Sequence, residues 1–177
     1  AASERKSQEM LAEYDREAEE RAAQRLYDSM FHVQMPADRP LTVFFAGDSL
    51  GAGFHATTKE QGYRWLVEDY FEQFGAVAST AATKDPSEPL FQIGNAKGIP
   101  ASGVDVAVIE LGTNDAGRTD PPVFRDQYRA FIQTIKAGSP DAAIVCAGIW
   151  GQEGVTREID NIIYQVCTEE GGKYVDL

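Results

Sequence analysis

Histidine, cysteine and basic residues are scarce in this chain of 177 residues. It has two histidines and two cysteines, and its 28 aspartates and glutamates outnumber 16 lysines and arginines, which leaves a formal charge of −12. Because phosphate neutralisation needs clustered Lys and Arg, this balance argues against a nucleic-acid partner and against adsorption to an anionic membrane surface. Two cysteines are too few for a zinc site, and the scattered carboxylates show no metal-ligand grouping, so we expect no metal ion.

Long apolar runs are missing as well. None approaches the roughly 20 residues of a membrane-spanning helix, and the chain is charged from Glu4 onward, which excludes a signal peptide within it. We therefore expect a soluble protein whose compartment stays open, a mature secreted form included. The hydrophobic fraction of 43% is typical of a folded domain with a core, and the length fits one domain with an appendage.

The two cysteines lie in segments of different kinds. Cys146 lies in a segment that is typical of a buried strand, and Cys167 in one that is typical of a helix. They can pair only if the fold brings them together. We expect two buried free thiols, because free cysteine behaves as a small apolar residue.

The first 35 residues differ in composition from the rest. From Ser3 to Met30 there is no glycine or proline, and Glu, Arg and Ala are abundant. Apolar residues recur at steps of three and four from Met10 to Phe31. This pattern predicts a charged amphipathic helix over 1–35, which can bind a protein partner or a second copy of the chain. Residues 36–40, bounded by prolines, are predicted as a linker.

From residue 41 to residue 177 strand and helix signals alternate. Apolar and β-branched runs predict strands at 41–46, 76–80, 104–111, 142–147 and 173–177. Helical periodicity predicts helices at 62–74, 121–137 and 155–170. Strands that are apolar on both faces and separated by helices indicate an α/β fold, with a mostly parallel sheet covered on both sides.

Ligands of such sheets bind where the strands end, so the turns after the strands are the first places to search. Ser49 directly follows the strand 41–46 in a glycine-rich turn, which exposes its hydroxyl and points its N–H toward the cleft. The stretch 51–56 also matches the nucleotide-binding pattern G-x-G-x-x-A formally. We disfavour that alternative because four residues separate its first glycine from the strand.

A second polar turn, 112–115, follows the strongest strand. Its Asn114 amide can donate into the same cleft as Ser49, because neighbouring parallel strands end at one edge of the sheet. Alone, Asn114 would be interpreted as a residue that caps its turn. With two polar turns at two strand ends, we favour a shared site.

Gly47-Asp48-Ser49-Leu50 and Gly112-Thr113-Asn114-Asp115 together resemble the motifs of the SGNH, or GDSL, hydrolases. The resemblance covers about residues 40–177 and implies a three-layer, flavodoxin-like fold. It implies a serine esterase that needs no cofactor and acts on a small-molecule, glycan or lipid ester. Ser49 would be the nucleophile, and the Asn114 amide and the Ser49 N–H would hold the oxyanion. A third donor would be a backbone N–H after the second strand, at Ala82 or, in competition with it, at Gly94.

The catalytic base is the feature of this family that the chain lacks. The family's D-x-x-H motif follows the final strand, whereas this chain stops at Leu177. His32 and His55 are the other candidates, and for both we favour a structural or exposed role. We expect the base to follow Leu177 in the native protein, which would make the domain 41–177 truncated. The alternative is an inactive member of the fold that serves as a binding or assembly module through its N-terminal helix. Trp150, at a strand end, is a candidate to line the substrate cleft.

Overall fold

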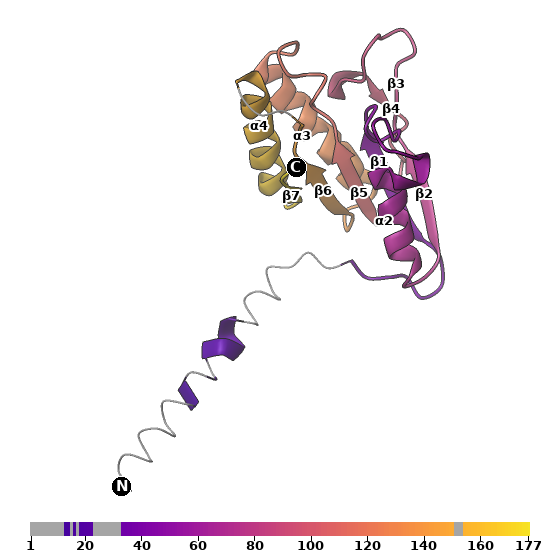
Figure 1. Ribbon diagram of the computed structural model, residues 1–177, viewed down its shortest axis with the longest axis vertical. Helices are drawn as coiled ribbons and strands as arrows, with labels where there is room; N and C mark the ends of the chain where they lie inside the picture. Colours follow the sequence, from indigo (N-terminus) through magenta and orange to yellow (C-terminus); the bar gives the residue numbers. More distant parts are fainter. Residues whose placement is uncertain (1–12, 15, 17, 23–32, 151–153) are drawn as a thin grey trace, which may run out of the picture. The chain divides into compact units, whose positions relative to one another are not determined.

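The computed structural model describes residues 13–14, 16, 18–22, 33–150 and 154–177 (Figure 1). The chain divides into two units, Ala1–His32 and Val33–Leu177. In the first unit the described residues are helical, while the rest of the predicted N-terminal helix and His32 lie outside the described residues. Residues 33–36 have no regular secondary structure, so the helix predicted over 1–35 does not include its last three positions.

A five-stranded sheet forms the centre of the second unit. In spatial order it contains β2 (Val77–Ala81), β1 (Leu41–Gly47), β5 (Val106–Glu110), β6 (Ala143–Ala147) and β7 (Lys173–Val175). Every neighbouring pair in this sheet is parallel. The predicted parallel α/β architecture is confirmed.

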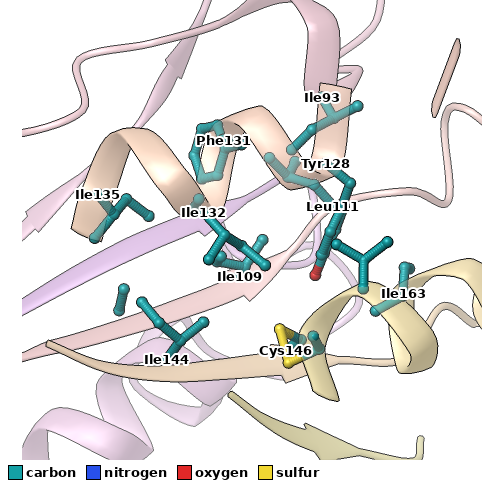
Figure 2. Close-up of a cluster of buried hydrophobic side chains, with 14 of the residues drawn as sticks. Ile93, Ile109, Leu111, Tyr128, Phe131, Ile132, Ile135, Ile144, Cys146 and Ile163 are labelled. Atoms are coloured by element: carbon teal, nitrogen blue, oxygen red, sulfur yellow. A yellow bond between two sulfur atoms is a disulfide. The ribbon is translucent and has the colours of Figure 1, made fainter. Parts of the chain in front are cut away.

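Helices cover both faces of the sheet (Figure 1). They are α2 (Tyr63–Glu72), α3 (Pro121–Gly138) and α4 (Val155–Glu169), with short 3₁₀ turns η1 (Lys59–Gln61) and η2 (Ile93–Asn95). Because side chains alternate along a strand, Val43 and Phe45 pack on the side of α2, whereas Phe44 belongs to the larger cluster with α3 and α4 (Figure 2). The result is a three-layer fold. No helix among the described residues is long and apolar enough to cross a membrane.

One small element was not predicted. β3 (Thr83–Lys84) and β4 (Ala96–Lys97) form an antiparallel pair between β2 and β5. Each strand has only two residues, which is too short for an alternating apolar pattern to develop. The pair holds the ends of the segment 85–95 together.

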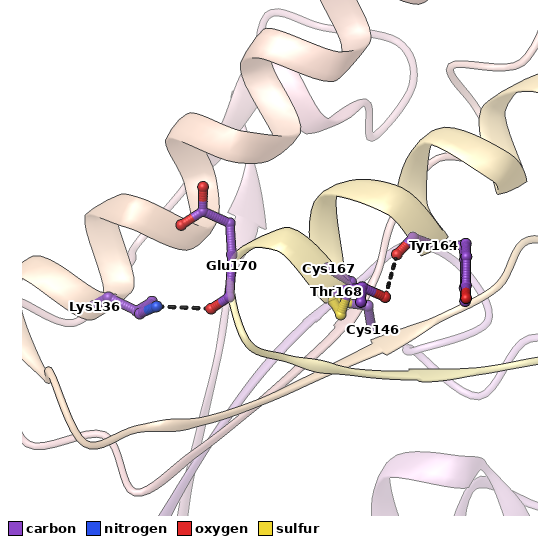
Figure 3. Close-up of a disulfide and its surroundings, with 6 residues drawn as sticks. All are labelled: Lys136, Cys146, Tyr164, Cys167, Thr168 and Glu170. Atoms are coloured by element: carbon purple, nitrogen blue, oxygen red, sulfur yellow. Dashed lines mark hydrogen bonds between the residues drawn. A yellow bond between two sulfur atoms is a disulfide. The ribbon is translucent and has the colours of Figure 1, made fainter.

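The cysteines are paired, so the expectation of two free thiols is wrong. Cys146 on β6 and Cys167 on α4 form a disulfide with their Cα atoms 6.2 Å apart (Figure 3). Both residues are fully buried. The spacing of 21 residues carries no sign of this pairing, because it depends on α4 packing back across β6.

Candidate active site

Ser49 lies on a tightly wound turn at the carboxyl end of β1. The buried Asp48 starts this turn, and its Oδ1 atom accepts the N–H of Leu50 at 2.9 Å. Further along, the N–H of Phe54 donates to the Ser49 carbonyl at 2.8 Å. Ser49 itself is exposed. The turn therefore presents the serine while the aspartate before it is held inside.

Asn114 lies on the turn that follows β5, the strand next to β1. The turn needs glycine at position 112, where φ is +138° and a Cβ atom would lie 3.0 Å from side-chain atoms of Ile149 and Ile163. Asp115, fully buried, accepts the N–H of Ile93 at 3.1 Å and the hydroxyl of Thr119 at 2.7 Å. These bonds fix the turn and, with it, the direction of the Asn114 side chain.

The two turns meet through their side chains. The Nδ2 atom of Asn114 donates to Asp48 Oδ2 at 3.1 Å and to the carbonyl of Phe91 at 3.2 Å. Burial raises the pKa of Asp48, while the Leu50 N–H acts in the opposite direction. A cavity of about 480 Å³ contains the site, with Asp48, Ser49, Leu50, Phe54, His55, Thr113, Asn114 and Trp150 as its lining. A serine hydroxyl and an amide donor in one cavity can attack a carbonyl and hold the resulting oxyanion.

His55 and Trp150 also line this cavity. The His55 backbone has a φ of +70°, and its ring contacts Phe54 edge-on with centroids 4.5 Å apart. Within the described residues, no hydrogen bond joins the His55 ring to Ser49. Trp150 is 62% exposed, so the expectation that it lines the cleft is confirmed at the level of position.

The expected third oxyanion donor is a correction. The backbone N–H of Ala82 donates to the Phe45 carbonyl at 2.8 Å, as part of the contact between β1 and the end of β2, so it is not free to face a ligand. Gly94 lies in η2, where a Cβ atom would come within 2.6 Å of the Gln127 side chain. Neither residue lines the Ser49 cavity. We therefore retain no third donor in the segment 79–94.

A second cavity adjoins the first, and sequence reasoning did not predict it. It has a volume of about 400 Å³ and shares Leu50, Phe54, His55 and Trp150 with the Ser49 cavity. Its further lining residues are Ala56, Gln61, Gly62, Tyr63, Glu110 and Leu177. The only available signal was the run of apolar and aromatic residues near Ser49, which the motif alone does not place on a wall of the site.

The loop that carries Trp150 is held by α4. Asp160 Oδ1 accepts the N–H of Ile149 at 3.1 Å, and Asp160 Oδ2 accepts the hydroxyl of Tyr174 at 2.7 Å. The aspartate therefore connects α4, β7 and the loop before Trp150. In the part of the chain that the structure describes, no three His, Cys, Asp or Glu side chains group as a metal site would require.

This fold, with a serine and an asparagine at the ends of neighbouring parallel strands, is that of the SGNH esterases. The model of the GDSL-like lipase/acylhydrolase family matches residues 45–177. The chain belongs to this family. Among curated proteins, no sequence matches it.

Solved structures with a similar fold are esterases by description. TesA is 19% identical, with 75% of this chain and 76% of that chain covered and a TM-score of 0.56. The psychrotrophic esterase EstA from Pseudoalteromonas sp. is 15% identical, with 77% of each chain covered and a TM-score of 0.54. A family two carbohydrate esterase from Clostridium thermocellum is 21% identical, with 80% of this chain and 56% of that chain covered and a TM-score of 0.56. At these identities the likeness is one of fold.

Proposed function

We propose that this protein hydrolyses carboxylic esters through an acyl-enzyme on Ser49. The Ser49 Oγ atom attacks the ester carbonyl and loses its proton, and the alcohol leaves with a proton as the acyl group stays on the serine. Water then attacks the acyl-enzyme and releases the acid. No electron transfer and no co-reactant other than water are involved.

One observation carries this proposal. Ser49 and Asn114 belong to turns that are distant in the sequence, yet they line one cavity at the carboxyl edge of the sheet. Ser49 is exposed there, whereas the polar residues beside both, Asp48 and Asp115, are buried and occupied with the turns themselves. The arrangement leaves the serine and the amide as the groups available to a substrate.

Asn114 supplies the side-chain donor to the oxyanion in this proposal. Its amide is held by Asp48, a buried acceptor, and by the Phe91 carbonyl. The contact with Asp48 sets the orientation of the amide plane, and the longer contact with Phe91 is the one that the oxyanion would replace. The backbone N–H of Ser49 is the second donor.

We propose that the substrate is an uncharged ester with an apolar acyl group. The adjoining cavity of about 400 Å³ falls within the roughly 300–1,000 Å³ of small-molecule sites. Leu50, Phe54 and Trp150 form walls common to both cavities, so an acyl chain on Ser49 can extend between them. Of the similar structures, EstA was solved inhibited by monoethylphosphonate and the carbohydrate esterase in complex with cellohexaose, so glycan esters form a second arm of the test.

The test measures hydrolysis of p-nitrophenyl esters and of an acetylated oligosaccharide by the wild type, Ser49→Ala and Asn114→Ala. Ser49→Ala is expected to abolish turnover, and Asn114→Ala to reduce kcat by about 10²–10³, the usual effect of losing one oxyanion donor. Asn161→Ala, at an exposed position on α4, is the matched control and should leave kcat unchanged. Turnover that survives in Ser49→Ala would contradict the proposal, and a wild type inactive on both substrate classes would favour a binding module.

A further inference from the structure

A group of buried polar side chains lies behind the turn that carries Ser49. Glu110 is the last residue of β5, and only 2% of it is exposed. Neither of its carboxyl oxygens has a hydrogen-bond partner of ordinary geometry among the described residues, and the same holds for the hydroxyls of Tyr63 and Tyr128. Because buried polar atoms without partners are rare and destabilising, an acid kept in this position needs an explanation.

The Glu110 carboxyl and the Tyr63 hydroxyl converge on Gly47, two residues before Ser49. A Cβ atom on Gly47 would lie 2.5 Å from the Tyr63 hydroxyl and 3.2 Å from Glu110 Oε2. A Cβ atom on Gly51 would lie 3.0 Å from the Gly47 Cα atom, since the chain folds back on itself here. The two polar tips therefore fill the inner side of the turn 47–51.

The surroundings keep Glu110 uncharged at neutral pH. Burial, and after it the charge of Asp48, raises the pKa of Glu110 to about 8, while the backbone N–H groups of Asp48 and Gly51 act in the opposite direction. Burial and the charge of Glu110 also raise the pKa values of Tyr63 and Tyr128. Glu110 is thus a protonated acid beside protonated hydroxyls.

We propose that Glu110 is a positioning residue for the esterase reaction: as an uncharged acid it supports the turn 47–51, and its ionisation disturbs the contact between Asp48 and Asn114. The inference rests on the proposed roles of Ser49 and Asn114. An ionised Glu110 places a second negative charge behind Asp48. Because Asp48 holds both the Asn114 amide and the Leu50 N–H, repulsion between the carboxylates shifts the oxyanion donor and the nucleophile turn together.

Several titratable or charged groups face Glu110 or its neighbours. They are Asp48 from the nucleophile turn, Tyr63 and Arg64 from α2, Tyr128 from α3 and His55 from the shared cavity wall. The two tyrosines stay protonated while Glu110 titrates, because their pKa values are raised. All of these groups are present in a Glu110→Gln variant as well, so their own effects cancel when the variant is compared with the wild type.

The test compares labelling of Ser49 by an alkyl fluorophosphonate in the wild type and in Glu110→Gln, from about pH 6 to about pH 9.5. Glutamine has the shape of the uncharged acid but does not ionise. The ratio of wild-type to variant rates is expected to fall about tenfold between about pH 7 and pH 9, because an acid with a pKa of about 8 loses most of its proton over this range.

The matched control is Glu72→Gln, which changes an exposed carboxylate at the end of α2. Its rate relative to the wild type should not vary with pH. A role of Glu110 in stability alone would lower labelling equally at every pH. A wild-type to Glu110→Gln ratio that is flat across the whole range, whatever its size, therefore overturns the proposal.

Unfolding by urea gives a readout that does not depend on Ser49. The unfolded acid ionises near its ordinary pKa of about 4.5, whereas the folded acid keeps its proton up to about pH 8. The wild type should therefore lose stability relative to Glu110→Gln as the pH rises from about 5 to about 8. A pH-independent difference would show that Glu110 is not held uncharged, which also overturns the proposal. If the unfolding result is as expected but Ser49 is unlabelled at every pH, the role of Ser49 fails and the role of Glu110 in serving it fails with it.

Discussion

Asp48 is the residue that joins the two turns of the site. One of its carboxyl oxygens accepts a backbone N–H of its own turn, and the other accepts the Asn114 amide. Because the aspartate is buried, these contacts are shielded from water and hold their geometry. The nucleophile and the oxyanion donor are therefore positioned by one shared carboxylate rather than independently.

Trp150 is the residue whose replacement should change substrate preference. Trp150→Ala is expected to lower the ratio of hexanoate to acetate hydrolysis about tenfold, because about 1.4 kcal/mol of apolar contact with the longer acyl chain would be lost. The measurement is kcat/KM on the two p-nitrophenyl esters. Leu66→Ala, at an exposed position on α2, is the control. An equal loss on both esters would show that Trp150 does not contact the acyl chain.

At this scale the sequence predicted part of the site. Ser49 and Asn114 could be found because each directly follows an apolar run that ends in a glycine-containing turn. Glu110 could not be found, because in the sequence it is only a carboxylate at the end of a strand. Its burial depends on Tyr63, which α2 brings from elsewhere in the chain.

At the scale of elements, the main helices and strands follow the predicted ranges closely. The helix predicted from residue 121 begins there, with proline in its first turn, and each central strand corresponds to an apolar run. The pairing of Cys146 with Cys167 was not predictable, because no local pattern reports which helix will pack on which strand. The segment 85–95 was equally unreadable, since its order depends on Asp115 and the short β3–β4 pair.

The disulfide should stabilise the contact between α4 and β6. It closes a loop of 21 residues, for which chain entropy gives about 3 kcal/mol. Reduction should therefore lower the free energy of unfolding in urea by about that amount in the wild type. The Cys146→Ala/Cys167→Ala variant is the control and should not respond to the reductant. Two free thiols titrated in the unfolded, unreduced protein would contradict the pairing.

At the scale of the whole molecule, charge and architecture agree with an uncharged substrate. The net charge of −12 repels anions over the surface and gives no attraction for nucleic acid. The site lies at the carboxyl edge of a parallel sheet, where this class of fold binds its ligands. The second unit also includes residues before the predicted linker, because Val33 and Met35 pack against the cluster beneath α2.

The most direct test of the central claim is labelling by a fluorophosphonate followed by peptide mapping of the intact chain. A nucleophilic serine forms a stable phosphonyl adduct, so the account predicts one adduct, on the peptide that contains Ser49. The adduct should be absent in Ser49→Ala and present at the wild-type level in Ser102→Ala, which changes an exposed loop serine. Labelling that persists in Ser49→Ala, or an adduct on another residue, would contradict the account.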